Sequence, residues 1–398
     1  MKRQGLKMKK HIIHYICLYT DENLYDKLFR EPAECAKIEY IVEALKSAGY
    51  GIRLFSTRSA KVRWRPVKPR TAVVDENEKH QYVFSMAGNR LMNKINAVLN
   101  RLQIVLYVLF RVKKSEPVLL YHQYYYYGVF TFLKRIKKFE LVLEIEELHF
   151  TLTHKMKEQE LSFIKLADKY LLIQPGLLKQ IDTDGKPYLI AYGDYRLPKT
   201  ARAAFYDGYY NVVFAGVIES RRNAAFLACK AAEYLDSRFR IHILGFGPEP
   251  EIQKLRGLIA EVNRRCGEER VLYHGKKTGA ALTEFLNACR VGLSCHSYSE
   301  KDKESEQFSF PSKIMMYLAH NLWVVSPDIA CVREAPFNGC IRFYAQGGEE
   351  TAPLKIAACI GDLFAHPGGE SIQPQELLIK IRAEFEAVLI NFINADPC

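Results

Sequence analysis

The residues with the most evident chemistry lie where an apolar stretch turns into a helix, at Pro311, Ser312 and Lys313. Proline suits a helix start, because its φ is already set and its missing N–H costs nothing there. Ser312 and Lys313 would then lie in the first turn, whose free N–H groups and positive dipole end attract anions. A lysine at this end opposes the dipole, which hints at a negatively charged ligand such as a diphosphate. On spacing alone, an ordinary helix with a solvated lysine is slightly favoured.

Acidic residues and a histidine end two apolar runs in the first half of the chain. Glu144, Glu146 and Glu147 close the run that starts at Leu141, and His122 follows the run 118–121. Clustered carboxylates raise one another's pKa, so one of them could act as a base or hold hydroxyl groups. The alternatives are a solvated acidic loop and a structural histidine.

Short apolar runs alternate with helical patterns along most of the chain, and these elements must position the candidates. Continuous runs with little polar alternation are typical of strands covered on both faces, and repeated β-α-β units predict a mainly parallel sheet. The expected strands are Ile12–Leu18, Ile52–Phe55, Val118–Tyr121, Leu141–Ile145, Tyr170–Ile173, Asn211–Ala215, Arg240–Leu244, Val271–Tyr273, Val291–Ser294 and Trp323–Val325.

The simplest architecture is an α/β chain of two doubly wound, Rossmann-like domains that face a cleft. We place the first domain at residues 1–200 and the second at 201–370. The segment Gly193–Tyr210 breaks the alternation and is expected to be a linker. Apolar residues recur by three and four in 371–398, which predicts an amphipathic helix that packs back towards the first domain.

Composition excludes several classes of protein. The chain has 398 residues, of which 48% are hydrophobic and 26% charged, so it is neither disordered nor collagen-like nor a coiled coil. No apolar run approaches the roughly 20 residues of a membrane span, and we expect the N-terminus to form a strand instead of a signal peptide. Cys17, Cys229 and Cys295 lie within apolar segments, as core residues of a reduced, cytosolic protein do. No Cys/His spacing fits zinc, so no metal is expected.

The formal net charge of +12 suits nucleic acid, an anionic membrane surface or phosphorylated ligands. Part of the surplus lies in two places in the first domain, a loop from Arg58 to Arg70 without any acid and a helical pattern at Asn93–Lys114. We expect the apolar residues of this helix to cover a sheet; the alternative is a helix lying on an anionic bilayer. Nucleic acid is disfavoured, because the cations lack the interleaved aromatic residues of a stacking platform.

The stretch Glu306–Val325 resembles the donor-site segment of GT-B glycosyltransferases, in particular bacterial enzymes of the retaining family four. The resemblance runs through Phe308, Ser309, Phe310, Pro311, Ser312, Lys313, Tyr317, Leu318 and Ala319. Met316 departs from the pattern, since the family has a glutamate there that holds the ribose of the nucleotide. Asn321 and Trp323 depart from it as well, at a glycine and a proline of the family.

Three further segments follow the family's order upstream of this stretch. They contribute a glycine loop with a cationic pair, a Gly-x-Gly turn and a glycine that faces the base. The arginine pair could grip a phosphate bidentately, or could be two exposed residues at a helix start. The donor-binding residues that the resemblance implies are Gly216, Arg221, Arg222, Gly245, Gly247, Gly275, Glu306, Phe310, Pro311, Ser312, Lys313 and Tyr317.

In the first domain, the run that ends in the acidic cluster resembles a strand of some of these transferases, and Glu146, Glu147 and His122 are the expected catalytic residues. The resemblance implies a glycosyltransferase that moves a sugar, with retention, from a UDP- or GDP-sugar to a carbohydrate or lipid-pyrophosphate-linked acceptor. It implies cell-surface polysaccharide assembly at the inner face of the cell membrane, without a cofactor. One alternative is a non-catalytic scaffold or partner subunit of another transferase, and Met316 in place of the family's glutamate supports it. The other is a nucleotide-sugar epimerase on the same fold.

Overall fold

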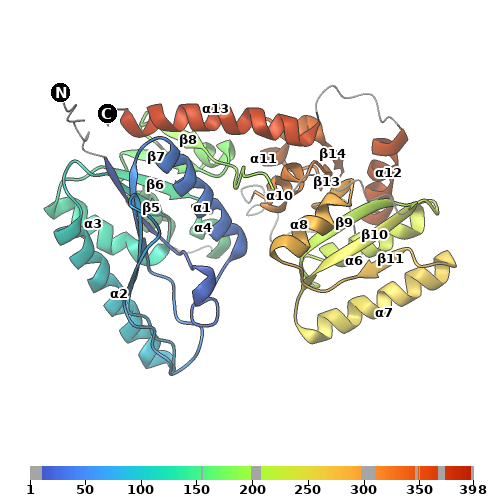
Figure 1. The fold of residues 1–398 in the computed structure, drawn as a ribbon, viewed down its shortest axis with the longest axis horizontal. Helices are drawn as coiled ribbons and strands as arrows, with labels where there is room; N and C mark the ends of the chain where they lie inside the picture. Colours follow the sequence, from blue (N-terminus) through green and yellow to red (C-terminus); the bar gives the residue numbers. More distant parts are fainter. Residues whose placement is uncertain are drawn as a thin grey trace, which may run out of the picture. The chain divides into compact units, whose positions relative to one another are not determined.

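The computed structural model describes residues 11–153, 156–198, 208–296, 310–345, 348, 350–365 and 373–395. Contacts divide the chain into two units (Figure 1). Unit 1 comprises Met1–Asp194 and Phe385–Cys398, and unit 2 comprises Tyr195–Glu384. Each unit has its own sheet.

The sheet of unit 1 has the strand order β3-β4-β2-β1-β5-β6-β7-β8. Every neighbouring pair is parallel except β3 and β4, which are antiparallel. The strands are β1 (Ile12–Cys17), β2 (Gly51–Ser56), β3 (Arg70–Val73), β4 (Glu78–Tyr82), β5 (Val118–Tyr121), β6 (Leu141–Ile145), β7 (Lys169–Leu172) and β8 (Tyr188–Ile190).

Helices connect these strands and cover both faces of the sheet. They are α1 (Pro32–Ser47), α2 (Arg90–Arg111), α3 (Tyr127–Ile136), α4 (His149–Thr153) and α5 (Lys157–Ile164). In Figure 1, α1 lies on one face and α2 and α3 lie on the other. This is expected of right-handed crossovers, because the chain adds strands in opposite directions before and after β4.

The sheet of unit 2 is entirely parallel and has the order β11-β10-β9-β12-β13-β14. Counted along the chain this is 3-2-1-4-5-6, the Rossmann order. The strands are β9 (Tyr210–Val217), β10 (Phe239–Phe246), β11 (Val271–Tyr273), β12 (Val291–Leu293), β13 (Trp323–Pro327) and β14 (Ile341–Tyr344).

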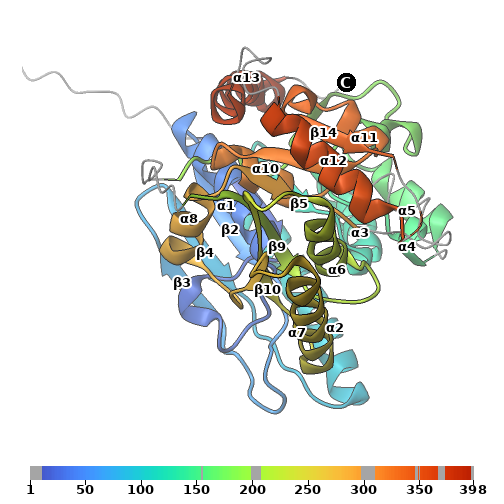
Figure 2. The ribbon, with the colours of Figure 1, turned by 90° about the vertical axis from the view of Figure 1, so that its right-hand side faces the viewer.

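The helices of unit 2 also form two layers. They are α6 (Ala224–Ala231), α7 (Glu249–Cys266), α8 (Gly279–Asn287), α10 (Lys313–Ala319), α11 (Ala330–Arg333), α12 (Ala352–Ala365) and α13 (Pro374–Asn394). Helix α6 contacts both α7 and α12, and α8 and α10 lie on the other side of the sheet (Figure 2). The last helix, α13, begins in unit 2 and ends in unit 1.

All strands that the apolar runs predicted are present, with ends that differ by at most two residues. Cys17, Cys229 and Cys295 are fully buried free thiols, as their apolar surroundings predicted. None of the helices in the described ranges is long and apolar enough to cross a membrane. The predicted linker falls partly on residues 199–207, which lie outside the described residues.

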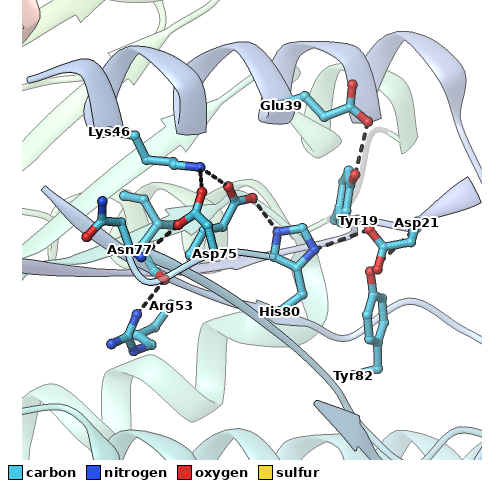
Figure 3. Close-up of polar contacts among 11 residues, drawn as sticks. Tyr19, Asp21, Glu39, Lys46, Arg53, Asp75, Asn77, His80 and Tyr82 are labelled. Atoms are coloured by element: carbon cyan, nitrogen blue, oxygen red, sulfur yellow. Dashed lines mark hydrogen bonds and ion pairs between the residues drawn. The ribbon is translucent and has the colours of Figure 1, made fainter. Parts of the chain in front are cut away.

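Strand β4 was not predicted, because the side chains it buries are polar. His80 lies between two carboxylates, with Nδ1 3.2 Å from Oδ1 of Asp21 and Nε2 2.6 Å from Oε1 of Glu78. Figure 3 shows His80 beside Asp21, Tyr19 and Tyr82. Burial alone would lower the pKa of His80, but hydrogen bonds to Asp21 and Glu78 outweigh it and raise that pKa to about 9. His80 is therefore an imidazolium at neutral pH, and it holds β4 to the segment that follows β1.

Candidate functional site

Each sheet has one point where the direction of strand addition reverses. It lies between β1 and β5 in unit 1 and between β9 and β12 in unit 2. In doubly wound sheets, ligands bind at such points, beyond the carboxyl ends of the strands. The candidate residues of each unit can therefore be located relative to its own switch point.

In unit 2, Lys313 begins α10, and its ammonium lies over the end of β9. A Cβ atom on Gly216 would come within 3.1 Å of Nζ, and Nζ lies 4.4 Å from the centroid of the Phe214 ring. Lys313 is half-buried, and burial lowers its pKa to about 8. Among the residues that the structure describes, no carboxylate or carbonyl bonds this ammonium. The lysine is thus a cation held in place without an internal counter-charge from those residues.

Arg222 adds a second positive charge beside Lys313. Its charge lowers the pKa of Lys313, and it also lowers the pKa of His296 together with Lys313. Arg222 is exposed, and its Nε lies 3.5 Å from Oε1 of Glu219. Arg221 is exposed beside it. The structure therefore brings Gly216, Arg222 and Lys313 to one edge of the sheet.

His296 joins this group and was missed in the sequence. It follows β12 at the carboxyl edge, and burial lowers its pKa to about 3, with Lys313 and Arg222 adding to the effect. A neutral imidazole in this place can donate or accept a hydrogen bond without adding charge. The signal that could have found it is the polar ending Ser294-Cys295-His296 of an otherwise apolar run.

Tyr317 holds the switch point together. Its hydroxyl accepts a hydrogen bond from the backbone N–H of Ala215 (2.9 Å) and donates one to the carbonyl of Leu293 (3.2 Å), which joins the ends of β9 and β12. The ring packs against Gly292, where a Cβ atom would lie 2.3 Å from it. Tyr317 is fully buried, so its place in the site is to position the strand ends.

The glycines of the predicted Gly-x-Gly turn lie where backbone segments meet. A Cβ atom on Gly245 would lie 2.0 Å from the carbonyl oxygen of Gly216, and one on Gly247 would lie 2.1 Å from that of Ile218. Gly245 also has a φ of +159°, and its N–H donates to the carbonyl of Gly275 (2.9 Å). These glycines therefore shape the carboxyl edge by letting β9 and β10 approach each other.

Replacing Gly245 by alanine should destabilise unit 2 by more than about 2 kcal/mol, since the new methyl group meets a backbone oxygen and the φ is unfavourable. The control is Gly257→Ala in α7, where open space surrounds the new methyl group. It should be neutral or raise stability by up to about 1 kcal/mol. Thermal unfolding of both variants is the measurement, and equal melting temperatures would contradict the steric argument.

The segment before α10 is only partly described. Phe310 is buried, and its ring lies edge-on to Phe337 with centroids 5.8 Å apart. The carbonyl of Pro311 accepts a hydrogen bond from Ile314, and Ser312 is the exposed N-cap. The helix thus begins at Lys313, two residues later than the proline predicted. Glu306, Phe308 and Ser309 lie outside the described residues.

In unit 1, the three predicted acids have three different surroundings. Glu144 is fully buried in β6, where Tyr15 donates a hydrogen bond to it and Lys37 Nζ lies 3.5 Å from its Oε1. Glu146 is partly accessible and pairs with the same lysine. Glu147 is exposed. Burial raises the pKa of Glu144 above its usual range, although Lys37 opposes this.

A fourth carboxylate, that of Glu34, lies near this cluster. Glu34 pairs with Arg58, whose Nη2 is 2.6 Å from its Oε2, and burial still raises the pKa of Glu34 to about 7. Arg58 itself is buried, so of the basic residues from Arg58 to Arg70 it does not contribute to the exposed surface. The pair with Glu34 explains this burial, because a buried guanidinium needs a carboxylate partner.

His122 is buried at the end of β5 and bonded on both ring nitrogens. Nδ1 is 3.2 Å from the carbonyl oxygen of Glu147, and the hydroxyl of Tyr127 lies 3.1 Å from Nε2. Burial lowers the pKa of His122 to about 3, with a contribution from His149. A neutral ring between these two groups can position the loop of Glu147. This surrounding does not suit a side chain that must reach a substrate.

No set of three or more His, Cys, Asp or Glu side chains in the described part of the chain is arranged to hold a metal ion. The charges at the edge of unit 2 are instead a lysine and an arginine. In unit 1 they are carboxylates paired with Lys37 and Arg58.

No protein-family model matches the sequence, and no curated protein does. Solved structures match it over nearly its whole length. A sucrose-phosphate synthase from Thermosynechococcus elongatus has a TM-score of 0.59 at 13% identity, covering 96% of both chains. An E. coli structure described as trehalose-6-phosphate bound with UDP-2-fluoro glucose has a TM-score of 0.62 at 10% identity, covering 96% of this chain and 100% of that one. Anabaena HepE in complex with UDP has a TM-score of 0.59 at 11% identity, covering 95% and 97%.

At such identities the likeness concerns the fold. The 3-2-1-4-5-6 order of unit 2, the extended doubly wound sheet of unit 1 and the match from end to end agree with one another. The chain has the GT-B fold that the resemblance predicted.

Proposed function

We propose that this protein is a glycosyltransferase that takes its sugar from a nucleotide-sugar donor. The observation that carries the proposal is the half-buried ammonium of Lys313 at the switch point of unit 2, with Arg222 near enough to lower its pKa. Breaking a sugar–diphosphate bond leaves negative charge on the diphosphate. Cations fixed beforehand bind that charge more tightly as it grows, so they stabilise the transition state more than the ground state.

We propose that the donor that binds at the carboxyl edge of the unit 2 sheet is a UDP-sugar. Two structures of similar fold hold UDP or UDP-2-fluoro glucose, which favours a UDP-sugar over a GDP-sugar. A side chain at Gly216 would come within 3.1 Å of Nζ of Lys313 and 3.2 Å of the Phe214 ring, so glycine lets the ammonium lie against the end of β9. We propose that Gly216, Arg222 and Lys313 bind the diphosphate and that His296 hydrogen-bonds the donor as a neutral imidazole.

Unit 1 would bind the acceptor. Glu146 and Glu147 lie at the carboxyl end of β6 and remain accessible, whereas Glu144 is fully buried. We propose that Glu146 and Glu147 hold or deprotonate the acceptor hydroxyl and that His122 and Lys37 position them. The acceptor would be a carbohydrate or a lipid-pyrophosphate-linked glycan, used with retention in cell-surface polysaccharide assembly at the inner membrane face. The net charge of +12 supports an acceptor that carries phosphate or lies on an anionic surface.

Met316 favours one other function. It stands in α10 where the resembling transferases have the glutamate that holds the ribose. A chain that had lost this group could serve as a non-catalytic partner of another transferase. The two functions differ in nucleotide binding, which the active enzyme needs and the scaffold does not.

The test is thermal unfolding of the purified chain with UDP, GDP, dTDP and UDP-glucose. A nucleotide present at about 100 times its Kd should stabilise the fold by roughly 2.7 kcal/mol, and UDP should have the largest effect. Arg222→Gln should reduce the shift. Arg238→Gln is the matched control, because this exposed arginine precedes β10 at the amino edge of the same sheet. Stabilisation by none of the nucleotides would contradict the transferase and support the scaffold.

A further inference from the structure

The outward face of α2 is apolar. The exposed fractions are 65% for Leu91, 40% for Ile95, 60% for Val98, 50% for Leu102, 46% for Leu106 and 77% for Phe110. Successive members are three or four residues apart, so they form one stripe along the helix. At about 1.5 Å per residue the stripe is roughly 28 Å long. These six residues are called the α2 stripe below.

Packing within unit 1 does not account for the α2 stripe. The buried face of the same helix carries Asn96 and Asn100 beside Ile104 and Val108. Asn96 accepts a hydrogen bond from the backbone N–H of Met86 (2.8 Å). A helix at the surface of a soluble protein normally turns its apolar side inward and its polar side outward. In α2 the most apolar side faces outward, so the expectation that its apolar residues cover a sheet is wrong for Leu102 and Leu106.

The charged residues in the sequence around the α2 stripe are all basic. The sequence has no Asp or Glu from residue 79 to residue 115. Arg90, Lys94 and Arg101 are exposed, and their spacing of four and seven places them along one border of the stripe. Arg111, Lys113 and Lys114 are exposed at its end. The exposed charged residues that α2 and its C-terminal flank place beside the stripe are therefore all cations.

The basic loop lies beside the start of α2. The N–H of Trp64 donates to the carbonyl of Ala87 (2.8 Å), and Val67 pairs with Ser85. The exposed cations of this loop are Lys61, Arg63, Arg65, Lys68 and Arg70. Trp64 is 64% exposed, and a Cβ atom on Gly88 would lie 3.6 Å from its ring. A tryptophan side chain that is largely exposed to solvent and packs on the protein at one edge suits a membrane–water interface, where its apolar ring and its N–H are both accommodated.

We propose that the α2 stripe, together with Trp64 and the basic loop, docks unit 1 on an anionic lipid surface. A helix that lies in the interface needs a long apolar face bordered by Lys and Arg, as α2 has. Charge complementarity selects the occupant, because anionic headgroups can neutralise all of these cations over the whole length of the stripe. The inference rests on the membrane contact of the function proposed above and on none of its chemistry. A failure of vesicle binding and a failure of sugar transfer are therefore separate results.

Co-sedimentation of the full chain with vesicles tests the proposal. The protein should pellet with phosphatidylcholine vesicles that contain about a third phosphatidylglycerol, and much less with phosphatidylcholine alone. Arg90→Gln/Lys94→Gln/Arg101→Gln should weaken binding to the anionic vesicles by about 100-fold, since each cation contributes roughly a factor of five. The control is Lys254→Gln/Arg256→Gln/Arg264→Gln, which removes three exposed cations from α7 in unit 2 and should leave binding unchanged.

The apolar contribution is tested separately. Leu102→Asp/Leu106→Asp should weaken binding to the anionic vesicles by at least roughly tenfold, because two leucine side chains no longer insert between the headgroups and the acyl chains. The matched control is Leu354→Asp in unit 2, which changes a leucine that is 53% exposed. Circular dichroism melts show that each variant is folded. Unchanged binding of both α2 variants would overturn the proposal, and so would equal losses in the controls.

Trp64 offers a direct readout of insertion. The chain has two tryptophans, so Trp323→Phe leaves Trp64 as the single fluorophore. Its emission should shift to the blue on adding anionic vesicles and should be quenched by lipids brominated near the headgroup. An unchanged spectrum would overturn the placement of Trp64 at the interface. If the chain is instead a dimer in solution that Leu102→Asp/Leu106→Asp dissociates, the occupant is a second copy and the lipid proposal fails.

Discussion

Replacing Lys313 by alanine should lower the rate of sugar transfer by about 100- to 1000-fold, the effect of losing one fixed group that stabilises transition-state charge. The structure predicts that this substitution changes the free energy of unfolding little. Burial lowers the pKa of Lys313 to about 8, which means that the charged ammonium is less stable in the folded chain than in water. The variant removes this unfavourable desolvation. Release of UDP in single-turnover assays separates the chemical step from binding.

The pH dependence gives Lys313 a signature of its own. With a pKa of about 8, the free enzyme loses the ammonium as the pH rises through that value. UDP affinity should therefore fall above pH 8 and level off below it. Lys313→Arg, whose guanidinium keeps its charge, should bind UDP without this fall.

Lys230→Ala is the matched control for Lys313→Ala. Lys230 is half-buried in the last turn of α6, a helix that starts after β9 and ends before β10, so it lies away from the carboxyl edge. Its removal should leave turnover and the pH profile unchanged. Normal turnover of Lys313→Ala would remove Lys313 from the site.

Replacing Lys37 by methionine should destabilise unit 1 by about 3–5 kcal/mol. Lys37 is buried and is the cation between Glu144 and Glu146, so its loss leaves the fully buried Glu144 without a counter-charge. The control is Lys46→Met. Lys46 pairs with Asp75 and Glu78 but lies nearer the solvent, and its loss should cost about 1 kcal/mol. Urea unfolding of both variants is the measurement.

The loss caused by Lys37→Met should depend on pH. Burial already raises the folded-state pKa of Glu144, and removing Lys37 raises it further. Below the ordinary pKa of a glutamate the carboxyl is neutral in both folded and unfolded states, and the penalty is small. It grows as the pH rises, because the unfolded chain then ionises while the folded one resists. The variant should therefore be closer to wild type near pH 4 than near pH 8.

A second substitution shows whether charge is the cause. Lys37→Met/Glu144→Gln removes the buried carboxylate as well, and it should recover at least half of the lost stability at pH 8. An unchanged loss in the double variant would mean that Lys37 acts through packing alone. Tyr15 remains a donor to the glutamine in this variant, so its hydroxyl is not left unsatisfied.

Apolar strands were predictable, and strands that bury polar groups were not. β5, β6 and β11 match the predicted ranges, because continuous aliphatic runs bounded by turns are typical of parallel strands. β4 buries Glu78, His80 and Tyr82, and such a sequence has the composition of a loop. Glu78 and His80 bond each other, but the further partners of these side chains, Lys46 and Asp21, are remote in sequence. A local pattern therefore does not mark them as buried.

The helix pattern of α2 was also predictable, but not the face that it buries. Periodicity shows that one side of a helix is apolar and does not show what lies against it. The buried side of α2 is held by Asn96 and Gln103, which bond backbone groups at Met86 and Phe84. Such contacts depend on the tertiary fold and leave no pattern in the sequence.

For the site, the resemblance located the segments and the fold brought some of them together. The neighbourhood of Gly216, Arg222 and Lys313 depends on the carboxyl edge of a sheet, which the predicted β-α-β order already implied. The sequence did not predict that His122 and Glu144 are buried. It also did not predict that His296 lies beside Lys313 and Arg222. They depend on how α1, α3 and α10 cover the strand ends.

Tyr317 and Gly292 make one steric unit, and this restricts how the sequence can diverge. Any side chain at position 292 would overlap the aromatic ring, so a larger residue there requires a much smaller one at position 317. The hydroxyl that joins Ala215 to Leu293 would be lost in the same change. Relatives too divergent to be found by overall identity should therefore show the two positions changing as a pair. That covariation offers a way to trace the lineage of this donor-side domain.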